Sequence, residues 1–234
     1  MTELMPFTAS TWDDATAIVY RIEGPGWGGS AMDRRAIRSL DIAVALIALL
    51  IAMPLMIAIA LAVRLSDGGP VLFGHRRLGE GGRPFRCLKF RSMITDADAR
   101  LTALLENDAD LREEWTRTQK LRVDPRITRV GNLLRRTSLD ELPQLFNVLR
   151  GDMSLVGPRP IVENEVARYG RHFAAYCSVP PGVTGLWQVQ READTSYRRR
   201  VAFDLTYARS RSLMLNVRIL LLTVPSVLRG RGAY

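Results

Sequence analysis

The stretch IAVALIALLIAMPLMIAIALAV, from Ile42 to Val63, decides the fold of this chain. It runs for 22 residues without a charge, which is long enough for a helix to cross a bilayer. The run begins well inside the chain, has basic residues on both flanks and lacks a small-residue cleavage site, so its pattern is not that of a signal peptide. Core helices seldom need so many consecutive apolar residues. We therefore predict a membrane helix over residues 34–65.

Pro54 and the flanking arginines bear on how this helix meets the membrane. A proline in mid-helix removes a backbone donor and kinks the helix. The positive flanks are formed by Arg34, Arg35, Arg38, Arg64, Arg76 and Arg77. Positive charge on both sides gives conflicting signals under the positive-inside rule, and it favours an anionic membrane face. A re-entrant helix broken at Pro54, entering and leaving by one face, explains both features. An ordinary spanning helix that tolerates its proline is the alternative, and these residues do not decide between the two.

Composition limits the remaining possibilities. The 234 residues carry a net charge of +9 and a pI of about 10.3, which suits anionic lipid, phosphorylated small molecules or nucleic acid. Nucleic-acid binders usually interleave aromatic and basic residues, whereas aromatics are only 7 % here, so we expect no nucleic-acid partner. Cys87 and Cys177 lie in unrelated contexts and are predicted to be reduced thiols.

The pattern of the rest of the chain predicts an α/β fold, mostly helical. We expect a compact membrane-associated domain with a small sheet and amphipathic interfacial helices. The expected division is a flexible segment 1–33, the membrane helix 34–65 and a catalytic domain 66–234. The expected elements are strands at 71–73, 85–90 and 186–189, a charged helix over 96–119, a basic loop over 122–131, helices over 138–149 and 162–169, and a basic amphipathic helix or pair over 196–229.

The stretch from Arg135 to Gln144 has the highest concentration of charged and polar side chains suited to catalysis. Ser138 and Glu141 have the spacing of a capping box, although a cap at Asp140 would suit Pro143 better. Either cap places Asp140 and Glu141 at a helix N-terminus. The helix expected over 138–149 has apolar residues at the i, i+3, i+4, i+7 spacing of one helix face, namely Leu142, Leu145, Phe146 and Leu149. We expect this apolar face to pack and the opposite face, with Asp140, Gln144 and Asn147, to stay open.

An acidic pair at a helix start usually does no more than favour the helix dipole. Here the surroundings point to chemistry. Basic residues precede the pair, among them Lys89, Arg91 and Arg135, and Arg159 follows between two prolines that restrict its backbone. Two carboxylates among several guanidiniums suit a bound diphosphate with a divalent cation. A carboxylate in such a site can also attack phosphorus directly.

Five motifs carry a resemblance to a known family. In order they are KFRSM at 89–93, DPRITRVG at 124–131, TSLDELPQLF at 137–146, GDMSLVGPRP at 151–160 and PGVTGLWQV at 181–189. As a set they closely resemble the bacterial sugar transferases, the monotopic phosphoglycosyl transferases that initiate exopolysaccharide, capsule or O-antigen synthesis. The resemblance covers about Arg34 to the C-terminus. Long relatives carry transmembrane helices ahead of this module, so the chain resembles the catalytic core alone.

The resemblance implies a reaction and roles. A sugar 1-phosphate passes from a UDP-sugar to polyprenyl (undecaprenyl) phosphate, with Asp140 as the nucleophile, a phosphosugar-aspartate as intermediate and UMP as the leaving group. It implies Mg²⁺ held by Asp140 and Glu141, and phosphates held by Arg135, Arg159, Lys89 and Arg91. It also implies a re-entrant helix at the cytoplasmic face of the bacterial inner membrane. A homo-oligomer is compatible with these features.

Three positions depart from the family pattern: Met53 replaces a common serine before Pro54, Gln190-Arg191 replaces Gly-Arg, and Asn216 replaces an acidic residue. Trp187 is expected to pack in the core, and together with the stretch 194–197 it favours a hexose over an N-acetylated sugar. Two other functions remain open. One is a non-catalytic anchored protein that binds anionic lipid, and the other is a metal-dependent diphosphate hydrolase that uses water instead of lipid.

Overall fold

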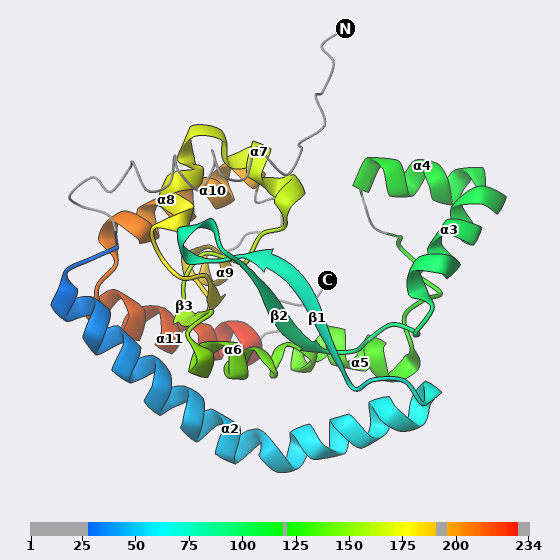
Figure 1. Ribbon diagram of the computed structural model, residues 1–234, viewed down its shortest axis with the longest axis horizontal. Helices are drawn as coiled ribbons and strands as arrows, with labels where there is room; N and C mark the ends of the chain where they lie inside the picture. Colours follow the sequence, from blue (N-terminus) through cyan, green and yellow to red (C-terminus); the bar gives the residue numbers. More distant parts are fainter. Residues whose placement is uncertain (1–27, 119–120, 191–195, 229–234) are drawn as a thin grey trace, which may run out of the picture. The chain divides into compact units, whose positions relative to one another are not determined.

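The structure is a computed structural model that describes residues 28–118, 121–190 and 196–228. The described residues form two compact units. The first unit contains residues 28–49, 75–87, 144–190 and 196–228, and the second contains residues 50–74, 88–118 and 121–143. Most described residues lie in helices, with two small two-stranded sheets, as the sequence predicts (Figure 1). The expected flexible segment at 1–33 falls largely outside the described residues.

Helix α2 (Ala31–Asp67) contains the whole apolar run. Within the described ranges it is the one helix long and apolar enough to cross a membrane, which confirms the predicted long apolar helix by length and composition. Pro54 lies inside α2, and the helix continues on both sides of it. Most large apolar side chains of the helix are exposed, among them Leu50 at 77 % and Ile51 at 75 %. Such a surface is unfavourable in water and favours association with lipid.

The first half of α2 packs within the first unit through one face. Ile37, Asp41, Ala45 and Leu49 recur every four residues and are buried. Asp41 Oδ1 accepts a 2.9 Å hydrogen bond from the backbone N–H of Leu155. This bond satisfies a carboxylate that the helix would otherwise bury without a partner.

Arg38, one of the arginines that flank the apolar run, also forms hydrogen bonds within the first unit. Its guanidinium donates to the carbonyl oxygens of Val148 and Leu149, at 2.6 and 2.8 Å. These carbonyls lie in the last turn of α6 (Gln144–Arg150), where intrahelical donors run out, and Val148 O also accepts from the N–H of Gly151 at 3.1 Å. Arg38 thereby joins α2 to the C-terminal end of α6.

The sheets are short. β1 (Leu72–Leu78) pairs with β2 (Pro84–Phe90) across the 3₁₀ turn η1 (Glu80–Gly82), so the first strand is longer than the three residues predicted. β3 (Ser154–Val156) runs parallel to β4 (Gly182–Thr184), with Ser154 opposite Gly182. The strand predicted at 186–189 is wrong, because those residues form helix α9 (Leu186–Val189) and the strand precedes them.

Glycines explain where β4 lies. A Cβ on Gly182 would stand 2.0 Å from the nitrogen of Gly157, and one on Gly157 would stand 2.4 Å from the carbonyl oxygen of Pro180. The two segments therefore approach backbone to backbone, which only glycine permits. Their hydrogen bonds run from Gly182 N to Pro158 O at 2.8 Å and from Gly157 N to Thr184 O at 2.9 Å.

The core of the first unit lies beneath its short helices. It is built around Leu78, Ile161, Tyr169, Tyr176, Cys177 and Val201. The contributing elements are β1, α7 (Val166–Tyr169), α8 (Phe173–Cys177) and α10 (Tyr197–Ser210), while the 3₁₀ turns η3 (Glu163–Glu165) and η4 (Gly170–His172) precede α7 and α8. With α11 (Leu213–Leu228), α10 forms the helix pair that the sequence offered as one of two options for its C-terminal end. Both cysteines are buried free thiols, as predicted.

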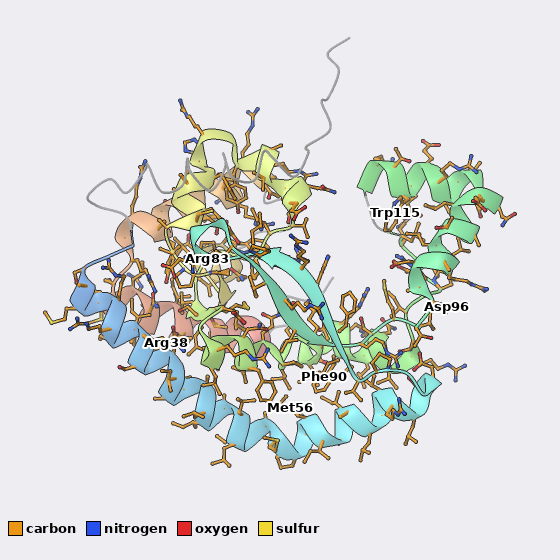
Figure 2. The ribbon with its side chains drawn as sticks, viewed as in Figure 1. Arg38, Met56, Arg83, Phe90, Asp96 and Trp115 are labelled. Carbon is orange, nitrogen blue, oxygen red and sulfur yellow. The ribbon has the colours of Figure 1, made fainter. Side chains whose placement is uncertain are left out.

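The second unit contains α3 (Ala97–Asn107), α4 (Ala109–Thr118), α5 (Arg129–Thr137) and η2 (Leu139–Glu141). The single helix predicted over 96–119 is wrong, because Asp108 adopts an extended backbone between α3 and α4. Its carboxylate caps α4 by accepting from the N–H groups of Asp110 and Leu111. Trp115, labelled on α4 in Figure 2, lies 5.2 Å from the Arg126 guanidinium, a cation–π contact between α4 and the loop before α5.

Candidate functional site

Asp140 and Glu141 lie in η2, a single 3₁₀ turn between α5 and α6. The predicted helix over 138–149 is wrong at its start. Ser138 has φ 56°, in the left-handed region, and ends α5, so its side chain caps nothing. Pro143 has no N–H to donate, and α6 begins immediately after it at Gln144. The acidic pair therefore stands in a tight connection rather than in the first turn of a long helix.

Lys89 brings the two carboxylates to one point. Its Nζ lies 2.6 Å from Glu141 Oε1 and 3.4 Å from Asp140 Oδ2. The Asp140 side chain is only 9 % exposed, whereas that of Glu141 is 38 % exposed. Among the described residues, Asp140 Oδ1 accepts no hydrogen bond, so its lone pairs remain available. Asp140 thus combines a fixed position with an uncommitted oxygen.

The environment controls the charge of Asp140. Burial raises the pKa of this carboxyl above its usual range, the positive charge of Lys89 opposes that rise, and the neighbouring Glu141 adds to it. Arg135 also lowers the pKa of Asp140. Burial disfavours the charged form of this carboxyl, and the two cations oppose that effect.

Ser92 connects Arg135 to the strand that carries Lys89. The Nε of Arg135 donates to Ser92 Oγ at 2.8 Å, and the N–H of Thr128 donates to Ser92 O at 3.1 Å. A Cβ on Gly131 would stand 2.0 Å from Ser92 O, so α5 approaches this backbone as closely as it does only because residue 131 is glycine. Sequence reasoning missed both Ser92 and Gly131, although each lies inside a quoted motif.

Arg91 is placed differently from Lys89. Its side chain is 8 % exposed and forms an ion pair with Asp67, at the end of α2. Its Nε and Nη1 are buried without a hydrogen-bond partner in the described structure. A Cβ on Gly69 would overlap the Arg91 guanidinium, so the turn after α2 is shaped around this side chain. Sequence reasoning also missed Asp67, which carries no motif signal.

Arg159 belongs to the first unit, where Pro158 and Pro160 flank it and the backbone on both sides is fixed. Gly182 N donates to Pro158 O at 2.8 Å, and Leu78 N donates to Ile161 O at 2.9 Å. The second unit holds the other predicted site residues, which are Lys89, Arg91, Arg135, Asp140 and Glu141. Within it, Lys89 and Arg135 act on the acidic pair, whereas Arg91 pairs with Asp67 instead.

The expectation that the polar face of α6 stays open is wrong. Gln144 and Asn147 are 4 % and 0 % exposed. Asn147 Nδ2 donates to Arg86 O at 2.8 Å and to Asp152 Oδ2 at 3.0 Å, so this polar face packs through hydrogen bonds. The expectation for Trp187 is confirmed, since it is buried with its ring 5.4 Å from the Arg200 guanidinium. Residues 191–195, on which the sugar preference partly rests, lie outside the described residues.

The carboxylate pair fits a hard divalent cation. The Lys89 ammonium shows that both carboxylates can converge on a single positive group. No group of three or more His, Cys, Asp or Glu side chains converges within the described ranges, so a cation here would have two protein ligands. Magnesium typically binds one or two carboxylates and takes its other ligands from water and substrate phosphates. The donor set therefore suits Mg²⁺ bound together with a diphosphate.

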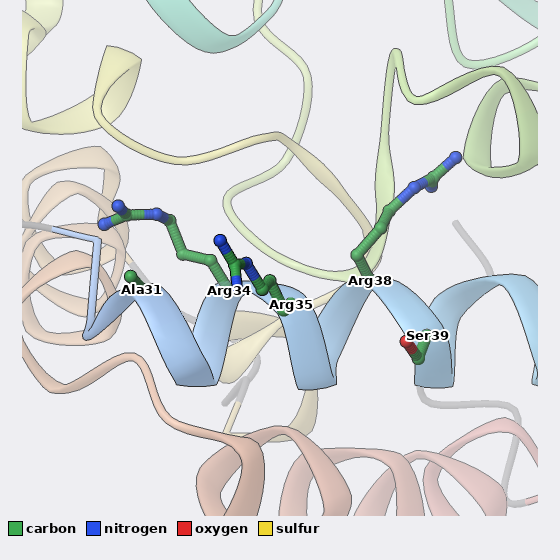
Figure 3. A pocket seen from close by; sticks show the side chains of 5 residues that line it. All are labelled: Ala31, Arg34, Arg35, Arg38 and Ser39. Atoms are coloured by element: carbon green, nitrogen blue, oxygen red, sulfur yellow. The ribbon is translucent and has the colours of Figure 1, made fainter.

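A separate pocket of about 600 Å³ lies against the start of α2 in the first unit. Figure 3 shows its lining side chains, Ala31, Arg34, Arg35, Arg38 and Ser39, along the first turns of the helix. None of the predicted site residues lines it. Its basic lining agrees with the arginine flank that the sequence assigns to an anionic membrane face.

Comparison with known proteins settles the family. Residues 32–230 match the family of bacterial sugar transferases. The chain belongs to this family. The match includes every site residue that the motifs predicted, from Lys89 to Arg159.

Curated members of the bacterial sugar transferase family are similar to nearly the whole described chain. The exopolysaccharide production protein ExoY of Rhizobium meliloti is 48 % identical over 197 residues, covering 84 % of this chain and 87 % of that protein. The undecaprenyl-phosphate galactose phosphotransferase of Salmonella typhimurium is 50 % identical, covering 84 % of this chain but 41 % of that protein. The UDP-glucose:undecaprenyl-phosphate glucose-1-phosphate transferase of Escherichia coli K12 is 41 % identical, covering 88 % and 43 % respectively.

Proposed function

We propose that this bacterial sugar transferase moves a sugar 1-phosphate, from a UDP-hexose, to undecaprenyl phosphate in the first step of an exopolysaccharide-type glycan. The names of its relatives support this class of reaction. The observation that carries the proposal is Asp140, a buried carboxylate with one uncommitted oxygen beside Lys89. Neither anchoring nor lipid binding alone would need such a group.

The first half-reaction uses Asp140 as the nucleophile. Its Oδ1 attacks the β-phosphorus of the UDP-sugar, and the bond from that phosphorus to the oxygen it shares with the α-phosphorus breaks. UMP leaves with the electron pair of that bond, and an acyl phosphate joins Asp140 to the sugar phosphate. Lys89 favours the ionised form of Asp140, since its positive charge lowers the pKa of that carboxyl. Arg135, fixed by Ser92, offers positive charge to the phosphate oxygens.

In the second half-reaction, an oxygen of undecaprenyl phosphate attacks the same phosphorus. The acyl-phosphate bond breaks, the Asp140 carboxylate is restored and the product is an undecaprenyl diphosphate sugar. Asp140 and Glu141 would hold Mg²⁺, which supplies charge neutralisation for the diphosphate and the leaving UMP. Arg159 and Arg91 complete the proposed set of phosphate-binding residues.

The experiment measures UMP release by detergent-purified protein with Mg²⁺, a UDP-sugar and undecaprenyl phosphate. We expect repeated turnover only when the lipid is present. Asp140→Asn should lose several orders of magnitude in rate, as expected for loss of a covalent nucleophile. Asp98→Asn, an exposed position on α3, serves as the matched control and should keep full activity. Turnover without lipid would favour a diphosphate hydrolase, and UDP as the product would exclude the mechanism.

We further infer that α2 is re-entrant and holds residues 66–234 as a catalytic domain at the cytoplasmic face of the inner membrane. Pro54 supports a bend in mid-membrane, since it removes a backbone hydrogen bond there. The exposed apolar residues of α11, among them Met214 at 78 % and Leu221 at 69 %, support an interfacial position for that helix.

Topology is tested by labelling with a membrane-impermeant thiol reagent. Arg35→Cys and Ser66→Cys place thiols near the two ends of α2, and both native cysteines are buried and give a low background. Both new thiols should react in inside-out vesicles and stay protected in right-side-out vesicles. Reaction of position 35 from the periplasmic side would exclude the re-entrant arrangement.

A further inference from the structure

Asp67, the last residue of α2, points its carboxylate at the turn that follows the helix. The N–H of Gly68 donates to Arg64 O at 2.9 Å, and Gly68 has φ 71°, the left-handed conformation that commonly ends a helix. Arg64 Nη1 also donates to Gly69 O at 3.1 Å. The N–H of Gly69 in turn donates to Asp67 Oδ1 at 3.3 Å. The apolar helix therefore ends in a defined turn with an acidic side chain folded against it.

Arg91 is the partner of this carboxylate within the second unit. Its Nη2 donates to Asp67 Oδ1, and its backbone N–H donates to Val71 O at 2.9 Å. The side chains of Arg91 and Asp67 are 8 % and 19 % exposed. Breaking a largely buried ion pair leaves a buried charge uncompensated, so a guanidinium that lost this carboxylate would have to leave its position. The end of α2 thus holds both the side chain and the backbone of Arg91.

Arg91 also lies between two residues that act on the acidic pair. Two positions before it, Lys89 Nζ lies 2.6 Å from Glu141 Oε1. One position after it, Ser92 Oγ accepts from Arg135 Nε at 2.8 Å. Because consecutive Cα atoms keep a fixed separation of about 3.8 Å, a displacement of Arg91 moves both of its neighbours.

We propose that Asp67 is a positioning residue: by pairing with Arg91 it fixes the backbone from which Lys89 reaches the acidic pair. No motif indicates this role for Asp67. The inference deepens the proposed function, on which it rests for the chemistry of the acidic pair. It gives the end of the apolar helix a covalent and ionic connection to the site, in which Asp67 acts through Lys89 and touches no substrate.

The chain allows the position of Lys89 to be measured directly, because its sequence contains only one other lysine, Lys120. Acetic anhydride attacks the neutral amine, so an ammonium held against carboxylates reacts slowly. The full chain in detergent is labelled and analysed by mass spectrometry, with Lys120 as the internal reference. Relative to that reference, Lys89 should react about threefold faster or more in Asp67→Ala than in wild type, since an amine that moves away from carboxylates is more often neutral.

The second measurement is a double-mutant cycle on UMP release. Asp67→Ala should lower kcat/KM for the UDP-sugar by about tenfold or more and move the acidic limb of its pH profile to higher pH, as expected for a displaced Lys89. In a Lys89→Gln background the same change should have little further effect, because the group through which Asp67 acts is gone. Asp67→Glu keeps the charge and should recover part of the loss.

Ser66→Ala is the matched control at the same end of α2. The Ser66 hydroxyl donates to Val63 O at 2.7 Å, a hydrogen bond that does not involve Arg91. This variant should therefore keep the wild-type labelling of Lys89, the wild-type kcat/KM and the wild-type pH profile.

Unchanged relative labelling of Lys89 in an Asp67→Ala protein with the wild-type circular dichroism spectrum would overturn the proposal. Losses in kcat/KM that multiply independently in the double variant would overturn it as well. If Asp67→Ala does not fold, Asp67→Asn, which keeps the size of the side chain and an acceptor for Gly69, is measured in its place by the same two readouts. Because the labelling needs no turnover, a wild-type protein that releases no UMP would refute the proposed function and leave the labelling test valid.

Discussion

Replacing Gly131 by alanine adds one methyl group at the point where α5 meets the strand that carries Lys89. The new Cβ would stand 2.0 Å from Ser92 O and 2.6 Å from the Cα and carbonyl carbon of the same residue. These are backbone atoms, which cannot rotate away as a side chain would. Since Cβ contacts essentially never fall below 3.0 Å, α5 must move by about 1 Å.

That movement reaches Asp140 in two ways. It strains the 2.8 Å hydrogen bond from Arg135 to Ser92, and it shifts the C-terminal end of α5, from which the turn with Asp140 begins directly at Ser138. A misplacement of about 1 Å at a reacting group typically costs about a hundredfold in rate. We therefore predict that Gly131→Ala lowers kcat/KM for the UDP-sugar by about a hundredfold.

The assay is UMP release with saturating undecaprenyl phosphate, accompanied by a thermal melt. Asn132→Ala is the control, because this neighbouring side chain on α5 is exposed and should leave kcat/KM unchanged. In an isolated helix the Gly131→Ala change would be favourable by about 1 kcal/mol, so the expected loss depends wholly on the contact with Ser92. A variant within about threefold of wild type in kcat/KM would refute the reasoning.

Three further predictions follow from the charges. Lys89→Gln removes a cation that lowers the pKa of Asp140, so the acidic limb of the pH–kcat/KM profile should move to higher pH. Lys89→Arg keeps the charge and should leave that limb in place. An acidic limb that does not move in Lys89→Gln would contradict this role of Lys89. Burial raises the pKa of Asp204 to about 6 from 3.8, so its contribution to stability is full below about 3.8 and is lost as the pH rises through about 6. Asp204→Asn should remove that decline from thermal melts taken across this window, and an identical slope in wild type and variant would speak against it. Treatment with EDTA should stop turnover and Mg²⁺ should restore it, whereas full activity in EDTA would exclude the metal.

Sequence reasoning found what periodicity and composition encode. The long run without charge predicted α2, and the strand predicted at 85–90 matches β2 within one residue. It failed where a single backbone conformation decides the structure. The left-handed Ser138 ends α5 and turns a predicted helix start into a 3₁₀ turn, although serine is a favoured N-cap residue. No local pattern signals that conformation.

The sequence predicted which residues belong to the site, but it did not predict the contacts that these residues make. The motif set named Lys89, Arg135 and the acidic pair, and the structure brings these together in the second unit. It could not predict that Asn147 would be fully buried, because an amide at a polar helix position indicates solvent unless its partners are known. Nor could it assign Asp67 to Arg91, since the two residues are far apart in sequence and only the fold brings them together.

The most direct test of the central claim is mass spectrometry of the intermediate. Protein incubated with a UDP-sugar and Mg²⁺, without lipid, is quenched, digested and searched for a peptide that has gained a phosphosugar. The account predicts this adduct on Asp140, released when undecaprenyl phosphate is added. An adduct on any other residue, or a protein that turns over fully with asparagine at position 140, would contradict it.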